Sequence, residues 1–581
     1  MGIWRCALLL GRALPLGVVL TVGPALAQVK DDAPLSAIDW LSQSVQVPAA
    51  ALVPQSIDEP PVALSAGTPE ITVTALDAPS PDTAGLLAPA VTGLPRSLWS
   101  RSDTVTLMTL VQAERVETLP ALQELMMTLM LAEADPPLGA GPEGALFLAR
   151  VDKLLDLGAL EPAQALLEAA GPDTPDLFRR WFDVSLLTGS EDTACAVLQT
   201  NPAIVSTYPA RIFCTARNGD WTTAALTLNT ARALGDVTDE EDALLSRFLD
   251  PELYSAEPPL PPPSRTSPLE FRMREAIGEG LTTAGLPLAF SHADLRSTTG
   301  WRSQIEAAER LARNLAISEN TLFGIYRART PAASGGVWDR AAAIQAFDTA
   351  LRARDLAAID ATLPVAWAAM EAIHTEVAFA RYYADDLLPL PMTGATSALA
   401  FRIGLLSPKY EAVALARIAP NADEQMLIAV ARGDVAGLNA ATPDRAAILA
   451  AFSSAKVPEP MAGQIAKGEL GEALLRGVSL FNQGLAGDLG ALTDALALLR
   501  AVGMEDVARR AALQYLLLDR QARARPLRRP PRGPWPTMPP CGRWPTMPPC
   551  GRWPIGFPRF WPHRPPNAMR QPTPNWPMPG I

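Results

Sequence analysis

Apolar side chains recur at helical spacing along most of the chain. Residues i, i+4, i+7 and i+8 lie on one face of a helix, so apolar runs with this spacing predict amphipathic helices. Two clear runs are Phe147, Val151, Leu154, Leu155 and Phe178, Trp181, Phe182, Leu186. Thr174-Pro175 places a cap and a first-turn proline just before the second run. The pattern predicts an all-α fold.

Glycines at regular spacing separate these apolar runs. Gly158, Gly189 and Gly219 lie about 30 residues apart. The fifth, seventh and ninth residues after each glycine are alanine or leucine: Ala163, Ala194, Ala224; Ala165, Ala196, Leu226; Leu167, Leu198, Leu228. A glycine permits the tight turn between two antiparallel helices, and a small residue lets the second helix pack closely on the first. Because one helix pair cannot bury its apolar face alone, the repeat predicts that such pairs stack.

One segment of this repeat resembles a known family, the tetratricopeptide-like helical repeats: Leu157-Gly158-Ala159-Leu160-Glu161-Pro162-Ala163-Gln164-Ala165-Leu166-Leu167. The period here is shorter than the roughly 34 residues of the standard repeat, and the aromatic-rich consensus is incomplete. The resemblance implies a TPR-like α-solenoid of antiparallel helix pairs. A solenoid of this kind presents a concave surface suited to peptides or partner proteins.

Composition divides the chain into successive parts. We expect a signal peptide at 1–27, a Pro/Ala-rich linker at 28–95, a helical-repeat block at 96–249, a Pro-rich connector at 250–267, a second helical block at 268–520 and a low-complexity tail at 521–581. The linker contains two short apolar islands, 34–41 and 71–76, which either dock on a partner or fold back on their own domain. The composition of the linker and of the tail predicts disorder.

The N-terminus has the features of a secretory signal peptide. Arg5 and Arg12 flank the start of a short apolar run, and the run ends in Ala25-Leu26-Ala27. The run is too short to span about 30 Å of hydrocarbon comfortably, so cleavage after Ala27 is favoured over a retained anchor. We therefore expect a periplasmic or secreted mature protein without a transmembrane span.

Export changes the interpretation of the cysteines. Cys195 and Cys214 are 19 residues apart in what we expect to be an oxidising compartment. A disulfide between them would join the second helix of one pair to the first helix of the next and contribute on the order of 3 kcal/mol. The alternative is two free thiols.

The tail differs abruptly from the rest of the chain. From residue 521 onward it has no Asp, Glu or Lys, it has ten arginines and five tryptophans, and the nine residues from Trp535 recur directly from Trp544. One interpretation is a basic, aromatic tail that binds an anionic polymer or a membrane surface. The other is out-of-frame translation of GC-rich DNA beyond a natural stop near residues 520–525. The identical repeat and the sudden change of composition favour the second.

Composition and motifs offer little for catalysis. The net charge of −12 argues against a nucleic-acid-binding protein, and 48% hydrophobic residues exclude a wholly disordered one. Three histidines leave little material for a metal site, and no nucleophile elbow, phosphate-binding loop or dinucleotide fingerprint occurs. We therefore expect no catalytic residue, no cofactor and no metal.

The most unusual loop precedes a predicted helix. Its two glycines would let the backbone approach a ligand closely, and an aromatic and two charged residues follow. The residues concerned are Ser334, Gly335, Gly336, Trp338, Asp339 and Arg340. The loop is either a ligand-contacting loop or turn chemistry alone, with Asp339 favouring the positive end of the helix.

An exported all-α array without a catalytic motif is most simply a scaffold for protein–protein interaction in the cell envelope. The chain as a whole is similar to uncharacterised exported Ala/Leu-rich alphaproteobacterial proteins, some of which bear an automatic antifreeze-glycopeptide label. It has no Ala-Ala-Thr array that would support ice binding. The alternative is a cell-wall-associated enzyme or accessory related to the α-superhelix of soluble lytic transglycosylases, although their catalytic Glu-Ser motif is not found.

Overall fold

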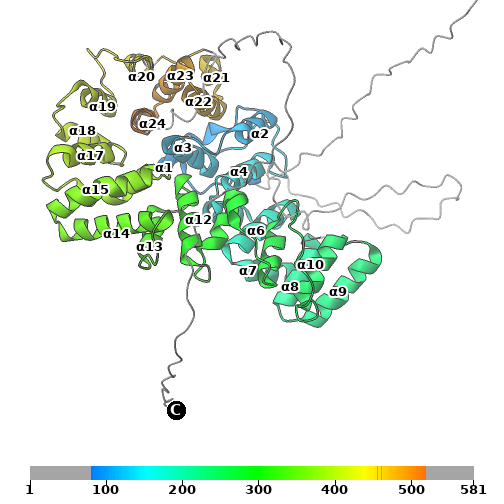
Figure 1. Ribbon diagram of the computed structural model, residues 1–581. Helices are drawn as coiled ribbons and strands as arrows, with labels where there is room; N and C mark the ends of the chain where they lie inside the picture. Colours follow the sequence, from blue (N-terminus) through cyan, green and yellow to red (C-terminus); the bar gives the residue numbers. More distant parts are fainter. Residues whose placement is uncertain (1–79, 206, 455, 460, 519–581) are drawn as a thin grey trace, which may run out of the picture. The chain divides into compact units, whose positions relative to one another are not determined.

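The computed structural model describes residues 80–205, 207–454, 456–459 and 461–518. Their regular structure is helical, and extended segments pair only at two isolated bridges, Leu87 with Ala132 and Asp103 with Leu138. The fold is therefore all-α, as the apolar spacing predicts (Figure 1). No helix in this part of the chain is long and apolar enough to cross a membrane.

Several features expected from the sequence lie outside the described residues. They are the signal peptide at 1–27, the islands at 34–41 and 71–76, and the tail at 521–581. Of the expected linker, only residues 80–95 are described.

Helices follow one another with short connections through the described chain. The first are η2 (Pro81–Thr83), α1 (Pro89–Thr92), η3 (Arg96–Leu98), α2 (Thr104–Ala113), α3 (Pro120–Leu131), α4 (Ala145–Asp156), α5 (Leu160–Ala170), α6 (Pro175–Thr188), α7 (Glu191–Thr200), η4 (Pro202–Ile204), α8 (Tyr208–Arg217), α9 (Trp221–Leu234) and α10 (Asp239–Leu249). The Pro-rich connector follows α10.

The helices after the connector are α11 (Pro268–Ala276), η5 (Thr283–Gly285), η6 (Leu288–Leu295), α12 (Trp301–Arg313), α13 (Glu319–Arg327), α14 (Val337–Ala353), α15 (Leu356–Glu371), α16 (Glu376–Leu387), α17 (Gly394–Leu405), α18 (Tyr410–Ala416), α19 (Ala422–Arg432), α20 (Pro443–Ser453), α21 (Met461–Lys467), α22 (Leu470–Leu485), α23 (Leu489–Ala501) and α24 (Glu505–Leu517). Neighbours in sequence pack on one another, as α14 does on α15 and α22 on α23.

The three repeat glycines lie in turns between consecutive helices. Gly158 separates α4 from α5, Gly189 follows α6, and Gly219 lies between α8 and α9. Their φ angles are +74°, +85° and +89°, in the left-handed region that glycine adopts without strain. At Gly158 the neighbourhood is also tight, because a Cβ would lie 2.8 Å from Cγ of Leu288.

The residues that follow each glycine divide between the two faces of the next helix. Those at the fifth and ninth positions are buried, because residues four apart share one face. Those at the seventh position point the other way and are exposed. The buried residues are Ala163, Ala194, Ala224, Leu167, Leu198 and Leu228, and the exposed ones are Ala165, Ala196 and Leu226.

A disulfide joins Cys195 on α7 to Cys214 on α8, which confirms the bond expected from the sequence. The two Cα atoms are 5.0 Å apart, and both side chains are buried. The bond therefore links two consecutive helices that also pack on one another.

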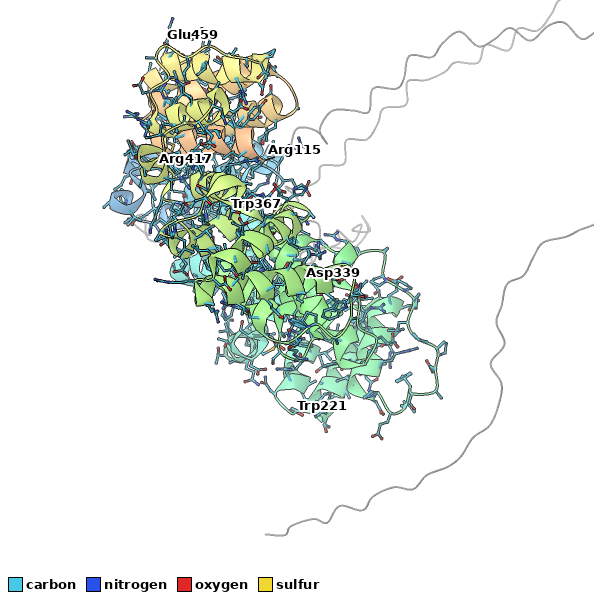
Figure 2. The ribbon with its side chains drawn as sticks, turned by 60° about the vertical axis from the view of Figure 1, so that its left-hand side comes forward. Arg115, Trp221, Asp339, Trp367, Arg417 and Glu459 are labelled. Atoms are coloured by element: carbon cyan, nitrogen blue, oxygen red, sulfur yellow. A yellow bond between two sulfur atoms is a disulfide. The ribbon has the colours of Figure 1, made fainter. Side chains whose placement is uncertain are left out.

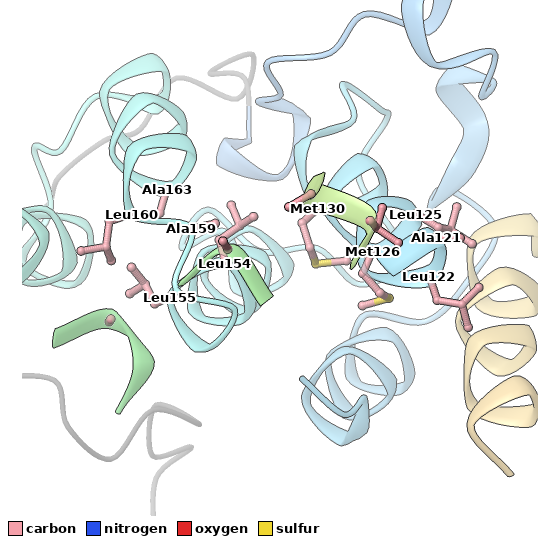
Figure 3. Close-up of a cluster of buried hydrophobic side chains, with 14 of the residues drawn as sticks. Ala121, Leu122, Leu125, Met126, Met130, Leu154, Leu155, Ala159, Leu160 and Ala163 are labelled. Atoms are coloured by element: carbon pink, nitrogen blue, oxygen red, sulfur yellow. The ribbon is translucent and has the colours of Figure 1, made fainter. Parts of the chain in front are cut away.

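Helix α3 is apolar on nearly every side and lies in the core. Its buried residues are Pro120, Ala121, Leu122, Gln123, Leu125, Met126, Leu129 and Met130. It contacts α4 on one side and α24 on another. Figure 3 shows side chains of α3 in this core with those of α4 and α5.

Helices from near the start and near the end of the described chain pack together. α3 contacts α24, and α2 contacts α22 (Figure 1). The backbone N–H of Ala121 donates to Oε1 of Gln514 at 2.8 Å, and the hydroxyl of Thr118 donates to Oδ1 of Asn482 at 2.5 Å. Gly471 on α22 leaves no room for a Cβ, because the ring of Trp99 lies against it. We call this contact of α2 and α3 with α22 and α24 the closing junction.

Residues 80–95 pack on the helices that follow, around a buried arginine. The guanidinium of Arg150 on α4 donates to the carbonyl oxygens of Met130 at 2.8 Å and of Ala84 and Ala132 at 2.9 Å. Burial lowers the pKa of Arg150 to about 10. Asp82 is also buried and accepts from the N–H of Phe147 at 2.6 Å. An arginine that needs carbonyl acceptors thus orders a segment whose composition resembles a linker.

Arginines from the helices before and after the Pro-rich connector at 250–267 bind its middle. Arg247 on α10 donates to the carbonyl of Pro258 at 3.0 Å, and Arg274 on α11 donates to that of Pro261 at 2.9 Å. Helix α11 then packs on α6 and α10. The first helix after the connector therefore packs on helices that precede it.

Candidate functional site

The glycine-rich loop at 334–340 leads into α14, and its polar groups serve the turn. Gly335 and Gly336 have φ angles of +95° and +57°. The N–H of Gly335 donates to Oδ1 of Asp339 at 2.9 Å, so Asp339 caps its own loop. Arg340 donates from Nε and Nη2 to the carboxylate of Glu309 at 2.8 and 2.6 Å.

The same loop borders a surface hollow of about 640 Å³, lined in part by Ser334, Trp338 and Asp339 (Asp339 is labelled in Figure 2). The ring of Trp338 lies 5.2 Å from that of Trp301, measured between centroids. Within the described residues, Arg340 is ion-paired with Glu309 and Asp339 accepts a backbone hydrogen bond of its own loop. A ligand-contacting role for the loop stays a prediction beside turn chemistry.

The two described histidines do not form a metal or catalytic cluster. Nε2 of His292 lies 2.6 Å from the carbonyl oxygen of Gly158, and burial lowers the pKa of His292. His374 lies in the turn between α15 and α16 with a φ of +61°. Among the described residues, no group of three or more His, Cys, Asp and Glu side chains is placed to hold a metal ion.

Two neighbouring hollows on α17, α18 and α19 form the candidate site, which we call the α17–α19 surface. The first, the Phe401 groove, has a volume of about 420 Å³. The second, the Arg402 pocket, has a volume of about 320 Å³. The groove is lined by residues that include Leu390, Met392, Phe401, Lys409, Val413 and Arg417. The pocket is lined by residues that include Arg402, Met426, Leu427, Arg445, Leu516 and Leu517.

One ion pair separates the two hollows. Arg417 lines the groove, Glu424 lines the pocket, and the guanidinium binds the carboxylate through two hydrogen bonds of 2.8 and 3.0 Å. The same guanidinium donates to Oγ of Ser397 at 3.1 Å and lies 4.9 Å from the ring centroid of Phe401 (Arg417 is labelled in Figure 2). A bidentate pair that also stacks on an aromatic ring is a rigid divider.

Large apolar side chains stand exposed on this surface. Leu415 in the last turn of α18 is 63% exposed, and Ile418, which follows α18, is 93% exposed. In sequence they flank Ala416 and Arg417, which line the groove, but neither Leu415 nor Ile418 is itself part of the lining. An exposed isoleucine is a candidate anchor for a partner, because burying it in an interface contributes about 1.5–3 kcal/mol.

Sequence analysis did not point to this surface. The segment Arg417-Ile418-Ala419-Pro420 carries one signal, a large apolar residue in a short connection before a proline. The grooves themselves combine residues from positions as far apart as Ala398 and Leu517. No local motif marks such a combination.

The comparisons with known proteins add no relative. No family model matches the chain, and no curated protein and no solved structure matches it.

Proposed function

We propose that the protein is an exported, non-enzymatic helical-repeat scaffold that binds a partner protein in the cell envelope through the α17–α19 surface. The proposal includes a TPR-like α-solenoid of antiparallel helix pairs as its architecture and a signal peptide at 1–27 as its route of export. Turn glycines between packed helices and a disulfide between two consecutive helices support it.

The observation that carries the proposal is the exposure of Leu415 and Ile418, which flank the groove-lining residues Ala416 and Arg417 in sequence. Interfaces bury apolar anchors in a central region rimmed by polar groups. The Phe401 groove combines both kinds of residue in its lining, with the apolar Leu390, Met392 and Phe401 and the charged Lys409 and Arg417.

Site-specific photo-cross-linking tests the proposal. The full chain is expressed in its native host with p-benzoylphenylalanine in place of Ile418 and, in a control, in place of Val105, which is 69% exposed on α2. We expect discrete light-dependent adducts from position 418, recovered in the envelope fraction, and none of the same mass from position 105. The adducts should disappear when Phe401→Ala is combined with the probe.

Three results would contradict the proposal. The first is the absence of adducts at position 418, and the second is identical adducts at both positions. The third is cleavage of peptidoglycan by the purified protein in a zymogram, which would favour the cell-wall enzyme described as the alternative.

A further inference from the structure

The Arg402 pocket differs from the Phe401 groove in its charge. Helices α17, α19 and α20 and the end of α24 converge on it. Met426, Leu427, Leu516 and Leu517 give it apolar walls, and the side chain of Met426 is buried. Its volume of about 320 Å³ is at the lower end of the range for small-molecule sites.

The pocket carries one uncompensated positive charge. Arg445 binds Asp423 at 2.6 Å, and Arg417 binds Glu424 at 2.8 Å, so both acids of the pocket are neutralised. Arg402 makes no hydrogen bond or ion pair with any described residue. The part of the pocket around Arg402 is therefore cationic, although the chain as a whole has a net charge of −12.

We propose that the Arg402 pocket binds a small organic anion with an apolar body, of the alkyl carboxylate class. The carboxylate pairs with the guanidinium of Arg402, whose planar fork matches it, and the alkyl chain lies against Leu427, Leu516 and Leu517. The pocket belongs to the α17–α19 surface but is a hollow distinct from the Phe401 groove, since Arg417 lines the groove, Glu424 lines the pocket and the two side chains form an ion pair between them.

A series of alkyl carboxylates of increasing chain length tests the apolar wall of the pocket, and an alkylamine tests its preference for an anion. Butanoate, hexanoate, octanoate and octylamine are titrated by calorimetry into the full-length mature protein. We expect affinity to rise about three- to fourfold per methylene group until the pocket is filled, because each buried CH₂ contributes about 0.8 kcal/mol. Octylamine has an apolar body of similar length with a positive head, so we expect no binding.

The variant R402Q tests the contribution of the Arg402 guanidinium charge to binding. Loss of a charge-assisted hydrogen bond is expected to weaken octanoate binding by roughly 10- to 100-fold. The matched control is R432Q, which removes another exposed arginine, from the last turn of α19, and is expected to bind octanoate like the wild type.

Three outcomes overturn the inference: no octanoate binding at millimolar concentration, equal affinity for butanoate and octanoate, or unchanged binding by R402Q. None of them bears on the cross-linking at position 418, so failure of this site and failure of the proposed scaffold function are distinguishable.

Discussion

Gly158 and Gly219 share a backbone conformation but differ in their surroundings. Both have positive φ, at +74° and +89°. A Cβ at Gly219 would meet no atom within 4 Å, whereas a Cβ at Gly158 would meet Leu288 at 2.8 Å. One glycine is therefore required by the turn alone, and the other by the turn and by the packing of η6.

We expect alanine substitutions at Gly158 and Gly219 to lower stability by different amounts. Gly219→Ala should lower the free energy of unfolding by about 1–2 kcal/mol, the usual effect of placing an L residue in the left-handed region. Gly158→Ala should lower it further, by about 1–3 kcal/mol, because the new methyl group overpacks against Leu288. Urea denaturation of both variants gives the comparison. Equal midpoints would show that Leu288 moves aside without loss.

Residue identity alone does not predict which arginine is buried and which is unpaired. The glycine pattern predicts turns, and the structure places the three glycines in turns, because a turn depends on neighbours in sequence. Arg150 and Arg402 both lie in helices, yet one is fully buried among carbonyl groups and the other lines an open pocket. Their roles depend on helices distant in sequence.

At the scale of single helices, the sequence predicts most of what is observed. The apolar runs at 147–155 and 178–186 lie within α4 and α6, and the cap-plus-proline signal at Thr174-Pro175 marks the start of α6. What the pattern misses is the direction of the seventh residue after each glycine. Leu226 looks like part of the repeat in sequence and is 66% exposed in the structure.

The disulfide between Cys195 and Cys214 links α7 covalently to α8. Replacing both Cys195 and Cys214 with alanine should lower the free energy of unfolding by about 3 kcal/mol, because the bond closes a loop with a sequence separation of 19. Denaturant titration checks the size of the effect. Maleimide labelling of the unreduced, unfolded wild-type protein is the control, and labelling at Cys195 would contradict the bond.

At the scale of the whole molecule, the closing junction brings together residues that no local pattern connects. The hydrogen bond between Thr118 and Asn482 spans 364 positions, and that between Ala121 and Gln514 spans 393. Glu124 on α3 adds ion pairs to Arg381 at 2.7 Å and Arg510 at 2.5 Å. A repeat pattern describes contacts between successive helices. It therefore predicts that these helices stack, but it does not predict the closing junction.

The junction also contains a carboxyl group whose ionisation opposes folding. Burial is the main cause that raises the pKa of Glu114 from 4.5 to about 7, against the opposing effects of Lys153 and of a hydrogen bond from Asn482. Between these two pKa values the folded chain binds more protons than the unfolded chain, so stability falls as the pH rises from 4.5 to about 7.

Glu114→Gln should remove this contribution. The loss of unfolding free energy between pH 5 and pH 8, measured by urea denaturation, should be smaller in the variant by up to about 3 kcal/mol. Glu376, whose pKa burial raises to about 8, keeps its own contribution in both proteins and serves as the internal reference. An identical pH dependence in the two proteins would contradict the assignment to Glu114.

The position of α3 has a consequence for biosynthesis. Ala121 leaves the ribosome 393 residues before Gln514, its hydrogen-bond partner on α24. At about 5–20 residues per second, roughly 20–80 s pass between the synthesis of α3 and that of α24. During this time, the side of the largely apolar α3 that packs on α24 is unprotected. The nascent chain therefore exposes an apolar surface until α24 is synthesised. Shortened translation products that lack α24 should be substrates for holdase chaperones and proteases.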